Sequence, residues 1–115
     1  DEGDHRRSGR HRVHDAIRHW FEAEGLDPSF GLSLPRRMRE TGFEIDSVEA
    51  ECHLCPGGSP VAQVMSASVE ALREKYVATG VASEADINSY VSDANDPTTW
   101  CVYYTTVRVV GRKSK

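Results

Sequence analysis

Apolar residues recur along the chain at two different spacings, and the change of spacing predicts where helices give way to strands. Near the start, five apolar residues share one face at helical spacing: Val13, Ala16, Ile17, Trp20 and Phe21. We therefore predict an amphipathic helix over residues 13–24, ended by Gly25. Residues 25–31 contain Asp-Pro and two glycines, which favour a turn-rich connector.

A second, shorter helix is predicted over residues 35–41. Ser33 is a suitable cap before it, and Gly42 stands where a left-handed residue commonly ends a helix. Beyond Gly42 the apolar residues alternate with acidic ones, which predicts a strand over residues 43–54. The alternation slips by one position near Ser47, and this slip predicts a β-bulge.

Helical spacing returns after the strand. A cluster of prolines and glycines over residues 56–60 ends the strand, and apolar residues then follow one helical face: Val61, Val64, Met65, Val69, Leu72 and Tyr76. We predict the longest helix of the chain here, closed by Gly80. Ser83 and Asp86 have the spacing of a capping box, which predicts one more helix that runs to Ala94.

The last element is predicted to be a strand over residues 100–110, because this stretch is rich in β-branched and aromatic residues and lacks Gly and Pro. We expect the strand to end at Gly111. The fold class is therefore α/β, with about four helices and two long strands. Two strands alone are marginally stable in water and leave unpaired edges, so we expect this single domain or fragment, residues 1–115, to complete a larger sheet.

Composition narrows the class of protein. The chain has 115 residues, of which 38% are hydrophobic and 28% charged, and these values argue against disordered, collagenous and disulfide-scaffold proteins. No apolar run approaches the roughly 18 residues that span a bilayer, so we expect no membrane span. The net charge of -4 argues against nucleic acid as the partner of the whole chain.

The cysteine count and the first residue bear on where the protein works. Three cysteines without dense spacing favour a reducing compartment, so we expect a cytoplasmic protein. The chain begins at Asp1, with neither an initiator methionine nor the apolar stretch of a signal peptide. A complete product and a piece of a longer one both stay open.

Three passages in order carry a resemblance to a known family. They are Gly25-Leu26-Asp27-Pro28-Ser29-Phe30-Gly31 after a helix, Leu34-Pro35-Arg36-Arg37-Met38-Arg39-Glu40-Thr41-Gly42-Phe43-Glu44 leading into a strand, and a closing strand followed by Gly111-Arg112-Lys113. In this order they resemble the C-terminal part of class I S-adenosylmethionine-dependent methyltransferases of the small-molecule type. The resemblance covers nearly all of this chain and the back half of such an enzyme.

The resemblance implies a partial Rossmann-like sheet, in which the two strands form an antiparallel hairpin at one edge. It also implies that the helical insertion, residues 56–98, caps the pocket of a small-molecule acceptor. The family holds S-adenosylmethionine with a glycine-rich turn after its first strand and an acidic residue after its second. This chain has no Gly-x-Gly, and Gly57-Gly58 is its only close glycine pair. The cofactor is therefore expected to be bound mainly by a region absent from this chain, and we assign no catalytic or cofactor-binding residue.

Topology nominates the substrate-binding positions, because ligands of open α/β sheets bind beyond the carboxyl ends of the strands. His53 lies near the end of the first strand, and Trp100 begins the return strand beside it. Asp4 and His5 are expected at the same rim, where the chain would leave a preceding strand. Met65, on the first inserted helix, is expected to face the pocket from above.

The run Cys52-His53-Leu54-Cys55 resembles half of a zinc or redox site. A closed zinc site needs about four ligands, and the chain offers only Cys101 and distant histidines to complete one. We therefore expect Cys52 to be packed in the core and assign no metal ligand.

Charged and aromatic clusters also have structural explanations. For His5, His11, His14 and His19 we expect a solvated helix start rather than a metal tract or a pH switch. The run Arg6, Arg7, Arg10 and Arg12 is diluted by acidic residues, which argues against a phosphate-binding role. No aromatic residues interleave with these arginines as a nucleic-acid platform requires. Trp20 and Phe21 are expected to cover the sheet. Alternation divides Trp100, Tyr103 and Tyr104 between the two faces of the last strand, so that one set is buried.

Two kinds of function stay open from the sequence. The first is the substrate-capping part of the methyltransferase, with the missing N-terminal half or another subunit as its partner. The second is a free-standing interaction or ligand-binding module that pairs its exposed strand edge with another subunit, including a second copy of itself. A small zinc-dependent module is a third alternative.

Overall fold

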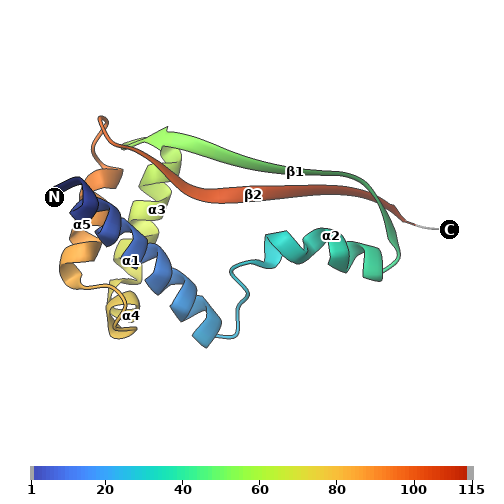
Figure 1. Ribbon diagram of the computed structural model, residues 1–115, viewed down its shortest axis with the longest axis horizontal. Helices are drawn as coiled ribbons and strands as arrows, with labels where there is room; N and C mark the ends of the chain where they lie inside the picture. Colours follow the sequence, from blue (N-terminus) through green and yellow to red (C-terminus); the bar gives the residue numbers. More distant parts are fainter. Residues whose placement is uncertain (1, 114–115) are drawn as a thin grey trace.

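A computed structural model describes residues 2–113, with side chains from residue 9 onward. Over these residues the protein is mixed α/β, with five helices and one two-stranded antiparallel sheet (Figure 1). The elements in chain order are α1 (Glu2–Ala23), α2 (Phe30–Glu40), β1 (Phe43–Pro56), α3 (Pro60–Ala71), α4 (Arg73–Ala78), α5 (Glu84–Ala94) and β2 (Trp100–Lys113).

The helices and the sheet occupy different parts of an elongated molecule. Figure 1 shows α1, α3, α4 and α5 gathered at one end as a helical unit, with the β1–β2 ribbon extending from it and α2 lying along the far half of the ribbon. The molecule measures 56 × 31 × 26 Å, and its radius of gyration is 16.9 Å. A compact domain of this length has a radius of gyration of about 13 Å. Within the described residues, no helix has both the length and the apolar character needed to cross a bilayer.

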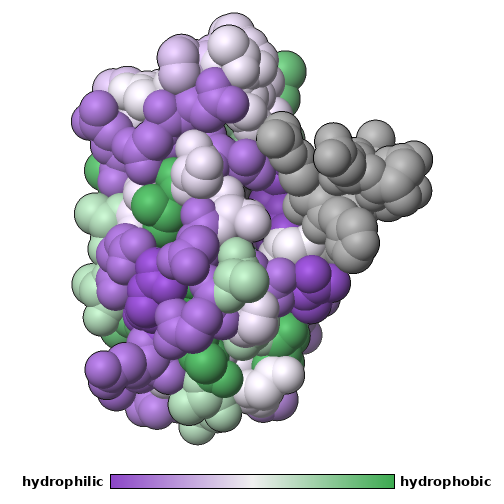
Figure 2. Space-filling view, turned by 90° about the vertical axis from the view of Figure 1, so that its left-hand side faces the viewer, coloured by the Kyte–Doolittle hydropathy of each residue, from purple (hydrophilic) through white to green (hydrophobic). Residues whose placement is uncertain are grey.

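The hydrophobic core lies mainly between the helices; the start of β2 enters it, and Cys55 at the end of β1 packs against it. Its buried residues include Val13, Val69, Tyr76, Ile87, Tyr90 and Cys101. The outward face of the helical unit is mainly hydrophilic, because its apolar stripes turn inward (Figure 2). The prediction that Trp20 covers the sheet is wrong: Trp20 packs edge-on against Tyr76 of α4, with ring centroids 5.9 Å apart.

The end of α1 confirms the prediction at Gly25. Gly25 has a φ of +81°, and the next residue, Leu26, donates its backbone N–H to the carbonyl oxygen of Phe21 at 2.8 Å. This is the Schellman ending that glycine permits. The helix begins at Glu2, well before the predicted start, because residues 2–12 carry no apolar stripe that periodicity can detect.

The second helix begins earlier than predicted, at Phe30, so Ser33 lies inside the helix and Ser29 stands at its cap position. Gly31, expected in a turn, is helical and lies against β2: a Cβ at Gly31 would sit 3.1 Å from the Val107 side chain. A Cβ at Gly111 would likewise sit 3.0 Å from the end of the Met38 side chain. Both glycines let α2 approach β2 closely, and β2 continues past Gly111 to Lys113 rather than ending there.

The predicted long helix after residue 60 is two helices, because the chain leaves helical geometry at Leu72, where φ is -108° and ψ is 15°. The longest described helix is therefore α1, which has 22 residues. The break places Arg73 between two acids, with hydrogen bonds of 2.6 Å to Glu70 and 2.7 Å to Glu84. The capping box of Ser83 and Asp86 at the start of α5 is confirmed.

The two strands pair in antiparallel register from Phe43 opposite Lys113 to Pro56 opposite Trp100. The predicted bulge is confirmed, since the register shifts between Ile45 and Ser47. A second shift, between Cys52 and Leu54, was not predicted. The expectation that Cys52 packs in the core is wrong: Cys52 is exposed, because the core meets the ribbon only at its helical end.

Candidate functional site

A cavity of about 650 Å³ lies where the helical unit meets the ribbon. Side chains of α1, α3 and α4 line it on one side, and β2, the connector after α1 and the first turn of α2 line it on the other. Its size falls within the range of roughly 300–1,000 Å³ typical of small-molecule sites. This cavity is the candidate functional site.

One wall comes from a single stripe of α1. Four of its residues line the cavity: His14, Ile17, Arg18 and Phe21. They are spaced by three and four residues, so they lie on one face of the helix. Sequence reasoning missed this stripe because it counted only apolar residues. A search for His and Arg at the same spacing as Ile17 and Phe21 would have found it.

The opposite wall comes from β2 at the second bulge. Four successive or alternate residues of the strand line the cavity: Tyr103, Tyr104, Thr105 and Val107. Because Tyr103 and Tyr104 together stand opposite the single residue His53, the alternation of β2 is broken and both tyrosines reach the cavity. The expected difference in burial is confirmed, since Tyr103 is buried whereas Tyr104 and Trp100 are exposed.

The remaining walls are mainly apolar or hydroxyl-bearing. They consist of Met65 and Ser68 from α3, Tyr76 from α4, and Pro28, Ser29, Gly31 and Leu32 from the connector and α2. No carboxylate is among the described residues that line the cavity. The site is therefore an apolar, aromatic pocket edged by hydroxyl groups, with one guanidinium and one imidazole.

Burial controls the protonation of two side chains at the site. The pKa of His14 is lowered, first by burial and then by the positive charges of His11 and Arg10, so the imidazole is neutral at neutral pH. Its ring stands edge-on to Tyr90, with centroids 5.9 Å apart. Burial, followed by the neighbouring Cys101, raises the pKa of Tyr103 to about 12. Both groups therefore offer neutral hydrogen-bonding atoms rather than charges.

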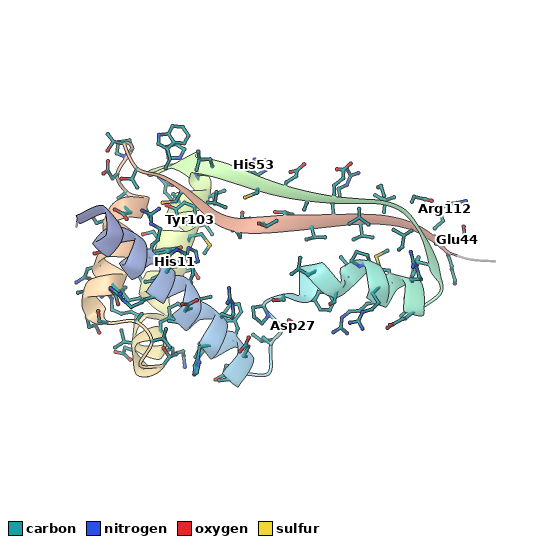
Figure 3. All side chains as sticks on the ribbon, in the orientation of Figure 1. His11, Asp27, Glu44, His53, Tyr103 and Arg112 are labelled. Carbon is teal, nitrogen blue, oxygen red and sulfur yellow. The ribbon has the colours of Figure 1, made fainter. Side chains whose placement is uncertain are left out.

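Of the three nominated substrate positions whose side chains the structure describes, one lines the cavity. Met65 lines it, as expected of a residue on the first inserted helix. His53 and Trp100 are exposed and do not line it; His53 pairs with Glu51 at 3.2 Å on the outside of the ribbon, whereas Tyr103 points among the helices (Figure 3). Asp4 and His5 fall in the first turns of α1, and their side chains lie outside the described part of the molecule.

The three cysteines lie in three different environments rather than together, as the ligands of a metal site do. Cys52 is exposed, Cys55 is half-buried and Cys101 is buried in the core. Across the described residues, no three potential His, Cys, Asp or Glu ligands converge. The thiol of Cys101 instead accepts a hydrogen bond of 2.8 Å from Arg10.

The basic start of the chain takes part in packing. Arg10 also lies 3.6 Å from Asp93, and Arg12 forms a two-pronged ion pair with Asp86 of α5. His14 is half-buried rather than solvated. The expectation of a solvated helix start is therefore wrong for His14 and confirmed for the exposed His11 and His19, because one face of this part of α1 packs on α5 and β2.

Comparison with known proteins finds no matching family model, no matching curated protein and no matching solved structure.

Proposed function

We propose that this chain is the acceptor-binding part of an S-adenosylmethionine-dependent methyltransferase that acts on a small molecule in the cytoplasm. The observation that carries the proposal is the position of the cavity. Its walls include α3 and α4, which are inserted after β1, and the β2 strand of the hairpin, and the resemblance in the sequence expects the inserted helices to cap the acceptor pocket. Met65, nominated from topology, is one of its walls.

The extended shape supports a role as part of a larger sheet. The ribbon has two strands of 14 residues each within the described chain, and both keep an edge without a neighbouring strand. Several apolar side chains along it are at least one third exposed, including Val48, Leu54, Val102 and Val110. A strand edge of this length normally pairs with another strand. The partial Rossmann-like sheet of the proposal supplies such a strand from the preceding half of the protein or from another subunit.

The glycine pair that follows β1 does not fit the role of a turn that holds S-adenosylmethionine. Gly57 and Gly58 follow β1, but the N–H of Gly57 donates to the carbonyl oxygen of Thr99 at 2.9 Å and that of Gly58 to Ala94 at 2.8 Å. A cofactor-binding glycine turn needs free N–H groups and room for the cofactor beside the backbone. The backbone of Asp96 fills the space beside Gly57. The proposal therefore gives cofactor binding to a different part of the protein.

The decisive experiment is to determine the intact mass of the protein purified from its natural source, followed by calorimetric titration with S-adenosylhomocysteine. We expect a polypeptide well above the mass of this chain that binds S-adenosylhomocysteine saturably. The 115-residue chain alone is the matched control and is expected to give no binding heat. A natural polypeptide that is no longer than this chain and does not bind S-adenosylhomocysteine would overturn the proposal.

The unpaired edges of the ribbon also favour a second candidate function, an interaction module that pairs through its sheet edge with another copy of the chain. Sedimentation at several concentrations together with backbone hydrogen exchange distinguishes the two candidates. The module predicts that the 115-residue chain is a dimer whose outer β1 or β2 amides are protected from exchange. The methyltransferase part predicts a chain whose edge amides are protected only in the longer natural protein.

A further inference from the structure

The cavity has a chemical character that restricts its occupant. Four aromatic rings face into it from three different elements, namely Phe21, Tyr76, Tyr103 and Tyr104, and Met65 lies beside them. Aromatic faces and a polarisable thioether are well suited to pack against a flat ring. We therefore expect the part of a ligand that fills the cavity to be aromatic.

The charge at the cavity comes from Arg18. Arg18 is exposed on the cavity stripe of α1, and no carboxylate among the described residues pairs with it. Of the other arginines with described side chains, Arg39 alone shares this lack of a carboxylate partner, and Arg39 is not part of the cavity. A guanidinium without an acidic partner, at the edge of a pocket without carboxylates, attracts an anionic group.

Two neighbouring groups complete this end of the site. His14 stands one helical turn before Arg18 on the same face and supplies a neutral imidazole. The Ser29 residue lies across the cavity on the connector and adds a hydroxyl group. Neither repels an anion, and both can hydrogen-bond to one of its oxygens.

We infer that the cavity binds an aromatic acid, with its ring between Met65 and Tyr103 and its carboxylate or phenolate turned toward Arg18. Room of about 650 Å³ accommodates a ligand of two or more fused rings. The inference rests on the proposed function in one respect only, in that it identifies this ligand as the methyl acceptor. Binding itself requires no cofactor.

Four probes of related shape test the inference by calorimetric titration of the full 115-residue chain, after an NMR spectrum has verified its fold. The probes are 2-naphthoate, its neutral amide, 2-naphthylmethylammonium and cyclohexanecarboxylate. We expect 2-naphthoate to bind about tenfold more tightly than the amide or the ammonium, because a charge-assisted hydrogen bond to Arg18 is worth about this factor. Cyclohexanecarboxylate is expected to bind more weakly than 2-naphthoate, because it keeps the charge and lacks the aromatic ring.

Variants of the protein test the contribution of the Arg18 charge to binding separately from that of the aromatic contacts. Arg18→Gln is expected to abolish the preference for 2-naphthoate over its amide, whereas the matched control Arg39→Gln leaves the preference intact. Met65→Trp fills the cavity and is expected to weaken all aromatic probes together. If the free chain is unfolded, the same titrations are carried out on the longer natural polypeptide. Equal affinity for acid and amide, or an Arg18→Gln variant that keeps the preference, would overturn the inference.

The outcomes also separate this inference from the proposed function. Arg18-dependent binding of 2-naphthoate in a natural protein that ignores S-adenosylhomocysteine would sustain the aromatic-acid site and refute the methyltransferase. Binding of S-adenosylhomocysteine by a natural protein that does not distinguish 2-naphthoate from its amide would support the methyltransferase and refute the aromatic-acid site.

Discussion

Arg12 and Asp86 join α1 to α5 through two parallel hydrogen bonds, from Nε to Oδ2 and from Nη2 to Oδ1, each 2.8 Å long. The same carboxylate accepts the backbone N–H of Ser83 at 3.0 Å and so completes the capping box of α5. Asp86 is buried although it is charged. One side chain therefore serves both the start of a helix and the contact between two helices.

This arrangement predicts a loss of stability in acid. The hydrogen bonds from Arg12, and secondarily those from Ser83, lower the pKa of Asp86 from 3.8 to about 2 against the opposing effect of burial. A carboxyl group whose folded pKa is lowered stabilises the fold above its unfolded pKa, and this contribution is lost as the pH falls from about 4 to about 2. Urea unfolding at intervals from pH 5 to pH 2 measures it.

The matched variants for this prediction are Asp86→Asn and Asp15→Asn. Asp86→Asn keeps an oxygen for the cap but removes the charge, so its free energy of unfolding is expected to be lower at pH 5 and to depend less on pH. Asp15 is an exposed aspartate on the same helix as Arg12, and its substitution is expected to leave the acid profile close to that of the wild type. Parallel profiles for the wild type and Asp86→Asn would refute the assignment.

Alanine substitutions at two adjacent glycines after β1 are predicted to destabilise the fold for different reasons. A Cβ at Gly57 would overlap the backbone carbonyl of Asp96, whereas a Cβ at Gly58 would meet nothing within 4 Å and would only occupy a φ of +82°. Gly57→Ala therefore requires a backbone shift and is expected to cost about 3 kcal/mol or more. Gly58→Ala is expected to cost about 1–2 kcal/mol through its left-handed conformation. Urea unfolding compares the two, and equal losses would show that the contact at Gly57 is not tight.

Local chemistry accounts for the parts of the fold that the sequence predicted. The end of α1 at Gly25, the capping box at Ser83 and the bulge near Ser47 each depend on residues within a few positions of one another. The early start of α2 does not depend on neighbouring residues alone, because Gly31 is helical and lies against Val107, which is far away in the sequence. The sequence alone does not distinguish a glycine that permits close packing from a glycine that permits a turn.

The candidate site was predictable only in part for a related reason. Met65 was found from topology, because a helix inserted between the strands has to pass over their ends. His14 and Arg18 were missed, because polar residues on a helix near the end of a chain usually face solvent. Their role depends on the β2 bulge that brings Tyr103 and Tyr104 together opposite α1, and the pattern of residues 100–110 shows no slip there.

A buried hydroxyl predicts a substitution that does not destabilise. The phenol oxygen of Tyr90 is buried and has no hydrogen-bond partner within the described part of the chain, while its ring packs edge-on against Tyr103 at 6.0 Å. An unsatisfied buried polar group costs about 1–3 kcal/mol, so Tyr90→Phe is expected to keep or raise the free energy of unfolding. Tyr90→Ala, which also removes the ring, is expected to lose about 3–5 kcal/mol. A clear loss in Tyr90→Phe would reveal a partner for the hydroxyl.

The lowered pKa of His14 predicts a second pH dependence, nearer neutrality. Burial comes first among its causes, His11, Arg10 and Arg18 add positive charge, and Asp15 partly opposes them. The unfolded chain therefore takes up a proton at His14 near pH 6.5 while the folded chain does so only at lower pH. Stability is expected to fall as the pH drops through about 6.5 and to level off below the folded pKa. His14→Gln is expected to flatten this part of the profile.

The titration of the His14 ring, followed by its NMR signal, links this behaviour to the proposed ligand. In the free protein we expect an apparent pKa below 6.5. An aromatic anion bound beside Arg18 offsets the positive charges around the imidazole and favours its protonated form, so saturating 2-naphthoate is expected to raise the pKa of His14. The neutral amide is the control, because it brings no charge near the imidazole and is therefore not expected to raise the pKa of His14. An apparent pKa at or above 6.5 in the free protein would contradict the burial of His14, and an equal effect of acid and amide would contradict an anion at this place.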